Sequence, residues 1–76
     1  MKTTLNELSV GQSAIVLSLG DESENAERLM EMGLVEGTKV EFVKCAPLGD
    51  PIEILVRGYH FSLRRHEAQQ IEVETE

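Results

Sequence analysis

Cys45, His60 and His66 are the side chains of this protein that could act as soft metal ligands. No two of them lie within four residues of each other, whereas zinc-finger and zinc-ribbon sites bring their ligands in closely spaced pairs. We therefore predict no native metal site and no cofactor, and we treat His60 and His66 as weak metal candidates that are better explained as surface histidines. Cys45 stands beside Ala46 and Pro47 and is expected to be a small buried side chain.

A catalytic centre would need a nucleophile, a base and an orienting group that converge in space. Ser62 and the two histidines are the only candidates for hydrolytic chemistry, and the sequence contains no glycine-rich phosphate loop or nucleophile turn. We therefore predict no catalytic residues and a protein that acts by binding.

The charge and length of the chain limit what it can bind. Seven Lys/Arg against 14 Asp/Glu give a formal net charge of -7 over 76 residues. Affinity for nucleic acids and for anionic membranes depends on positive charge, so neither is an expected partner. A chain this short forms one domain with a thin core, which we expect to cover residues 1–76, with its core at about 5–73 and a solvated tail at 74–76.

The sequence also predicts a cytoplasmic protein. Its one cysteine cannot form an internal disulfide, which suits a reducing compartment. The N-terminus leads into no apolar segment typical of a signal peptide. The longest apolar run, residues 14–17, is far shorter than the ~20 residues that cross a bilayer, so no direct membrane insertion is expected.

The one basic stretch of the chain contains Arg57, Arg64 and Arg65, and no acidic residue occurs between Ile54 and His66. Two interpretations remain open. The arginines could pair with Glu53, with Glu67 or with the preceding helix, or they could form a basic docking surface on an otherwise acidic body.

The elements that must position these residues follow from hydrophobic periodicity. Alternation predicts five short strands at 14–19, 39–44, 52–56, 60–63 and 71–73, with helical turns at 4–7 and 65–70. The first strand is expected to group Ile15, Leu17 and Leu19 on one face. The residues expected to share one core are Phe42, Ile54, Phe61, Leu63 and Ile71. Short sequential strands favour a closed sheet, so we predict a mainly β fold, a small SH3-like barrel of about five strands with one inserted helix.

That helix is expected between Gly20 and Gly33. Asp21 or Ser23 can cap its start, and the spacing of Ala26, Leu29 and Met30 predicts a narrow apolar face. Gly33 is expected to end it in the left-handed conformation, with Leu34 closing a Schellman motif. On this basis Gly33→Val should destabilise the fold more than Gly20→Val. Gly37 is expected to supply the positive φ of a type II turn.

Several motifs together resemble one known family, over about residues 5–73. They are Arg28-Leu29-Met30-Glu31-Met32-Gly33-Leu34, Gly37-Thr38-Lys39-Val40, Ala46-Pro47-Leu48-Gly49-Asp50-Pro51, Arg57-Gly58-Tyr59, Ser62-Leu63-Arg64-Arg65 and Glu67-Ala68. The combination resembles the FeoA family, and more weakly the SH3-like C-terminal domain of iron-dependent repressors. Glu36 departs from the proline usual in the family at that position.

The resemblance implies an SH3-like barrel that acts in ferrous-iron uptake beside FeoB, a membrane transporter with a cytosolic GTP-binding domain. We expect a non-catalytic accessory protein, a monomer or weak homo-oligomer, that docks onto the cytosolic part of FeoB at the inner face of the membrane. The residues expected to touch this partner are Leu48, Asp50, Arg57, Tyr59, Arg64 and Arg65. The alternatives are a GTPase activator that uses Arg57 or Arg64 as an arginine finger, and a regulatory module that either responds to a metal ion through weak, family-level binding or binds a repressor-like partner.

Overall fold

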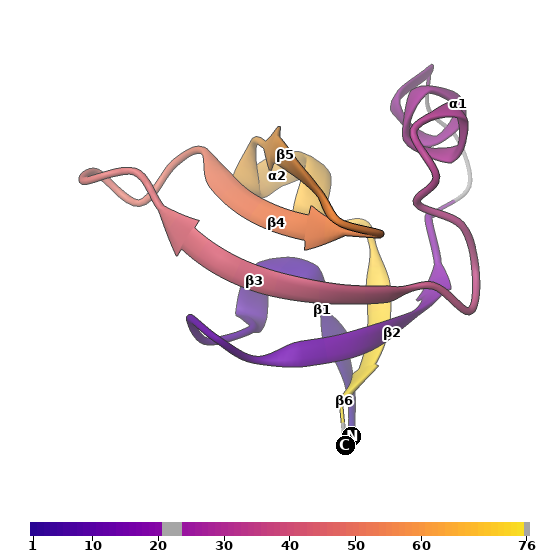
Figure 1. Ribbon diagram of the computed structural model, residues 1–76, viewed down its shortest axis with the longest axis horizontal. Helices are drawn as coiled ribbons and strands as arrows, with labels where there is room; N and C mark the ends of the chain where they lie inside the picture. The colour runs from indigo at the N-terminus through magenta and orange to yellow at the C-terminus, as the bar shows by residue number, and fades with distance from the viewer. Residues whose placement is uncertain (21–23, 76) are drawn as a thin grey trace.

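The structure is a computed structural model that describes residues 1–20 and 24–75, and its centre is one antiparallel sheet that curls on itself (Figure 1). The six strands lie in the order β1-β6-β2-β3-β4-β5. Along the chain the elements are β1 (Lys2–Thr4), the 3₁₀ helix η1 (Leu5–Glu7), β2 (Ser13–Ser18), α1 (Glu24–Glu31), β3 (Lys39–Cys45), β4 (Ile52–Val56), β5 (Tyr59–Leu63), α2 (Arg65–Ala68) and β6 (Glu72–Thr75).

The sheet has one strand more than the sequence predicts. β1 is short and polar, and it exists as a strand because Lys2 and Thr4 pair with Glu74 and Glu72 of β6. The same pairing extends β6 through Thr75, so Glu74 and Thr75 belong to the sheet and not to a solvated tail. Hydrophobic alternation cannot reveal a strand whose stabilisation comes from backbone pairing with the other end of the chain.

The core lies between the curled sheet and the two shorter helical segments, and most of its predicted members are confirmed. Phe42, Ile54, Leu63 and Ile71 are all at most 2% exposed. Phe61 is only partly buried and packs against the edge of the cluster. The prediction for Cys45 is wrong, because its side chain is exposed. The buried apolar residues are Leu5, Leu8, Ala14, Val16, Leu29, Leu34, Val40, Phe42, Ile52, Ile54, Val56, Leu63, Ala68, Ile71 and Val73.

The face of β2 that carries Ala14 and Val16 is turned inward, and the face that carries Ile15 and Leu17 is turned outward. Ala14 and Val16 are buried, whereas Ile15 is partly exposed and Leu17 is exposed. The register of β2 against β6 shifts between Val16 and Ser18, and this irregularity brings Leu19 back against the core. Apolar residues on both sides of this strand leave its orientation open, and the pairing with β3 and β6 decides it.

The end of α1 is the Schellman motif that the sequence predicts. Gly33 has φ 97°, its N–H donates to Met30 O at 3.0 Å, and the Leu34 N–H donates to Leu29 O at 2.9 Å. Leu29 and Leu34 are buried together, but Met30 is 48% exposed, so its place on the predicted apolar face is wrong. The predicted caps Asp21 and Ser23 and the side chain of Ala26 lie outside what the structure describes.

The glycines at the two ends of this insertion differ in what surrounds them. Both have positive φ, 83° at Gly20 and 97° at Gly33. A Cβ on Gly20 would stand 3.1 Å from Gln70 O, while a Cβ on Gly33 would meet only Arg57 Cδ at 3.7 Å. We therefore expect substitution of Gly20 to destabilise the fold more than substitution of Gly33, which is the reverse of the order that the sequence predicts.

We expect Gly33→Ala to lower the free energy of unfolding by about 1–2 kcal/mol, the cost of a left-handed non-glycine residue. Gly20→Ala should lower it by a further ~1 kcal/mol or more, because the Gln70 carbonyl must also move. Urea unfolding followed by circular dichroism measures both values. A larger loss for Gly33→Ala than for Gly20→Ala would contradict the packing described at Gly20.

Candidate functional site

The six residues expected to touch a partner divide between the two ends of β4. Leu48 and Asp50 belong to the loop that precedes β4, and Arg57 to the turn that follows it. At about 3.3 Å per residue, the five residues of β4 separate these ends by roughly 17 Å. Figure 1 shows the β3–β4 loop projecting from the sheet far from the β4–β5 turn. We call the first region, with Leu48, Asp50, Arg64 and Arg65, the loop end, and the second, with Arg57 and Tyr59, the turn end.

Leu48 is the most exposed large apolar side chain at the loop end, with 97% of its surface accessible. The loop that carries it is closed by backbone hydrogen bonds. The Gly49 N–H donates to Ala46 O at 2.7 Å, and the Ala46 N–H donates to Pro51 O at 2.9 Å. Pro47 occupies the second position of the tight turn, where its fixed φ favours the turn. Leu48 is thus presented to solvent by an ordered loop.

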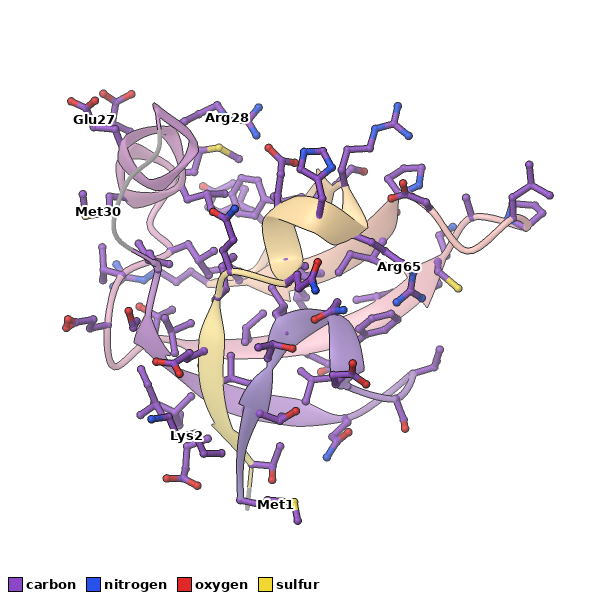
Figure 2. The ribbon with its side chains drawn as sticks, turned by 180° about the vertical axis from the view of Figure 1, so that it is seen from behind. Met1, Lys2, Glu27, Arg28, Met30 and Arg65 are labelled. Carbon is purple, nitrogen blue, oxygen red and sulfur yellow. The ribbon has the colours of Figure 1, made fainter. Side chains whose placement is uncertain are left out.

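Arg65 is a structural clamp at the loop end. Its side chain is partly buried, its Nε donates to Gly49 O, and its Nη1 donates to Asn6 O at 3.1 Å. Its backbone N–H donates to Asp50 Oδ1 at 2.9 Å. Figure 2 shows the Arg65 side chain extending from α2 on the side of the β3–β4 loop. Arg65 is therefore held by hydrogen bonds and is not a freely exposed arginine, and Asp50 accepts a hydrogen bond from its backbone.

Arg64 remains exposed beside this clamp, and no ion pair joins it to another residue in the described part of the chain. Its backbone N–H donates to Glu67 Oε1 at 3.0 Å. The other carboxylate oxygen of Glu67 accepts from Arg28 Nη2, also at 3.0 Å, which links α2 to α1. The expected partner Glu67 is therefore engaged by the helix arginine, and the side chain of Arg64 is left for solvent or a ligand.

The turn end is built by a tight hairpin. Arg57 has φ 52° and Gly58 φ 86°, and Val56 pairs with Tyr59 across them, which is the geometry of a type I′ turn. Arg57 is exposed and Tyr59 is 69% exposed. A shallow groove of about 540 Å³ runs beside the turn, lined by residues 35–39, Glu41, Leu55, Arg57 and Gly58.

The two histidines lie on different elements, His60 on β5 and His66 on α2. His60 Nδ1 lies 2.9 Å from Glu53 Oε2 across the β4–β5 hairpin, and His66 is exposed on α2. Within residues 1–20 and 24–75, no three His, Cys, Asp or Glu side chains are grouped so that they could hold a metal ion. In the same residues no helix is long and apolar enough to cross a membrane.

Comparison with known proteins identifies the family. The FeoA domain family matches residues 3–75. The chain is 40% identical over 70 residues to an Fe(2+) transport protein A/Fe(2+) transporter FeoB fusion protein of Porphyromonas gingivalis, and the match covers 92% of this chain but 8% of that protein. The chain thus spans only a small part of the length of this curated relative.

Solved structures agree with this assignment. FeoA from Chlorobium tepidum is 42% identical, with a TM-score of 0.91 over 96% of this chain and 70% of that one. The zinc complex of FeoA from Stenotrophomonas maltophilia, described as a procaryotic SH3 domain protein, is 38% identical, with a TM-score of 0.82 over 95% and 89% of the two chains. IdeR of T. acidophilum, at 18% identity, shares the fold alone.

These matches confirm the predicted mainly β, SH3-like fold. The residue motifs, the sheet of six antiparallel strands and the match over residues 3–75 lead to one assignment. The chain belongs to the FeoA family.

Proposed function

We propose that this protein assists ferrous-iron uptake by docking, in the cytoplasm, onto the cytosolic part of a FeoB-type transporter. The observation that carries the proposal is the Porphyromonas gingivalis relative, in which the two proteins form one polypeptide. A covalent link keeps two modules at a high effective concentration. Joining the two modules in one polypeptide is useful when they act on each other, and direct action requires a binding surface on this domain.

The loop end has the properties of such a surface. Leu48 offers an exposed apolar side chain on a loop that Arg65 and two backbone hydrogen bonds already order. Binding through a preordered loop avoids much of the entropy cost of immobilisation. Arg64 adds an exposed positive charge beside it, which would steer an acidic partner and make the association sensitive to salt.

We expect Leu48→Asp to weaken binding of the cytosolic part of the transporter by at least about tenfold. An apolar side chain that becomes buried in the complex is replaced by a charge that resists desolvation. Arg64→Glu should weaken it a few-fold, with the loss shrinking as salt is raised. Isothermal titration at two salt concentrations measures both. Val10→Asp, at another exposed apolar side chain (67%) in a separate turn, is the matched control and should bind as the parent does.

Unchanged affinity of Leu48→Asp would exclude the loop end as the docking surface and direct attention to Arg57 and Tyr59. A GTP turnover assay on the same samples tests the arginine-finger alternative. That alternative expects loss of GTPase stimulation with binding retained in Arg57→Asn or Arg64→Gln, since a finger acts in the transition state. Repeating the titration with added Fe²⁺ tests the metal-responsive alternative, which expects the affinity to depend on the ion.

A further inference from the structure

The outer edge of β5 carries backbone groups that are available for pairing. β5 is the last strand in the sheet order, and among the described strands it pairs only with β4. Val56 and Tyr59 flank the two-residue turn and form a hydrogen-bonded pair, so His60 and Ser62 direct their N–H and C=O groups away from β4. Both residues are exposed, and no other described backbone group bonds to them.

Two arginines stand at the ends of this edge. Arg57 lies in the turn before β5, and Arg64 directly follows the strand. The extended chain from Tyr59, the first residue after the turn, to Arg64 has five residue steps and spans roughly 17 Å. Both are exposed, neither pairs with an acidic residue of the described chain, and no acidic residue lies between Ile54 and His66. In a protein of net charge -7, this edge is a local exception.

We propose that β5 is a docking strand that takes an extended acidic segment of about seven residues from a partner protein as an additional strand of the sheet. The free N–H and C=O groups of His60 and Ser62 would pair with the backbone of that segment. Carboxylates near its two ends would meet Arg57 and Arg64. The net negative charge of the domain opposes this only weakly, because charges beyond about 8 Å are screened at physiological salt.

The aromatic side chains of β5 indicate what the middle of the segment contains. Tyr59 is 69% exposed and Phe61 is partly buried against the core. Tyr59 and Phe61 are two residues apart and therefore lie on the same face of β5. An added strand would place every second one of its own side chains beside these two rings. Apolar residues at these positions would bury the exposed part of both rings. The expected segment therefore alternates apolar and acidic residues.

A second copy of this chain is a poorer occupant of the same edge. If two β5 strands paired antiparallel about Phe61, the turn that carries Arg57 of one copy would lie close to the exposed Arg64 of the other. Like charges placed opposite each other on neighbouring strands are destabilising, and charged residues at an edge are a common protection against self-pairing. The arginines thus discourage association between copies while they favour an acidic strand.

This inference rests on the proposed function only in one respect, the identity of the protein that carries the acidic segment. Strand addition itself can therefore be tested without the transporter. The probe is a blocked seven-residue peptide of alternating glutamate and valine, titrated into the ¹⁵N-labelled protein. We expect the amide exchange rates of His60 and Ser62 to fall at least tenfold at saturation, while those of Tyr59 and Phe61, already bonded to β4, change little. The same peptide with N-methylated backbone amides should not bind, and a lysine–valine peptide should not bind either.

Variants test the role of the two arginines. Arg57→Asn, which tolerates the positive φ, and Arg64→Gln should each weaken the peptide about two- to fivefold. Lys2→Gln, which removes the same charge on the other edge strand β1, should leave the peptide affinity unchanged.

Equal binding of the N-methylated peptide would overturn strand addition. Protection of His60 and Ser62 that rises with protein concentration alone would establish self-pairing instead, and the absence of peptide binding would reject the docking strand. Peptide binding without transporter binding would reject only the proposed function.

Discussion

Replacing Phe42 with alanine is expected to lower the free energy of unfolding by about 3–5 kcal/mol, which is much of the stability available to a small domain. Phe42 is 2% exposed in the middle of β3, where it pairs with Ile54 of β4. Its backbone N–H donates to Gln12 O and its C=O accepts from the Gly11 N–H, so the strand lies at the centre of the curled sheet. The loss combines lost burial with the cavity left behind.

Phe61→Ala provides the comparison. This ring is only partly buried, and because stabilisation follows the apolar area removed from water, we expect roughly half the loss found for Phe42. Phe42→Leu should lose less than about 1.5 kcal/mol, since it nearly conserves volume. Guanidinium unfolding monitored by far-ultraviolet circular dichroism gives the three values. A loss for Phe61→Ala as large as that for Phe42→Ala would show that the β4–β5 hairpin packs more deeply than its burial indicates.

Replacing Arg65 with glutamine is expected to lower the free energy of unfolding by about 1.5–3 kcal/mol, the range for hydrogen bonds made by charged groups. The change removes the bonds to Gly49 O and Asn6 O that hold the β3–β4 loop to α2 and η1. The loss of unfolding free energy for Arg65→Lys should lie between zero and the loss for Arg65→Gln, because a lysine keeps the charge but cannot reproduce the planar fork of donors. Arg64→Gln, at an exposed side chain with no ion pair among the described residues, should stay within about 0.5 kcal/mol.

The loop itself gives a second readout for Arg65. In Arg65→Gln the amides of Ala46 and Gly49, which close the loop at 2.9 and 2.7 Å, should exchange faster, while amides in β3 remain protected. Unchanged exchange at both amides would show that the backbone bonds suffice and that Arg65 is no clamp. Replacing both Arg64 and Arg65 with glutamate is accordingly a poor test of docking, since the loss of Arg65 is expected to disturb the fold. Arg64→Glu alone tests the surface charge.

Features that depend on neighbouring residues were predictable. Alternation correctly placed Phe42 on the inner face of β3 and Ile54 on the inner face of β4, because a strand with one buried face must repeat every second residue. Gly33 and Gly37 were placed correctly at positive φ, since few other residues adopt that conformation.

Features that depend on contacts between residues distant in sequence were not predictable. The orientation of β2 depended on a shift in its register with β6, and β1 on pairing with the opposite end of the chain. The close approach of Gln70 O to Gly20 is the reason why we expect substitution of Gly20 to be more destabilising than substitution of Gly33. None of these contacts leaves a periodic or compositional signal, because each joins segments that only the closed sheet brings together.

The candidate site divides in the same way. The sequence by itself determined the family, the acidic body and the one acid-free stretch that contains Arg57, Arg64 and Arg65. Only the tertiary structure separated that stretch, by turning Arg65 inward onto Gly49 and Asn6 and by placing Arg57 and Leu48 at opposite ends of β4. The reason is physical: composition fixes which charges a chain carries, but their partners and directions depend on which backbone carbonyls and carboxylates the fold brings within hydrogen-bonding distance.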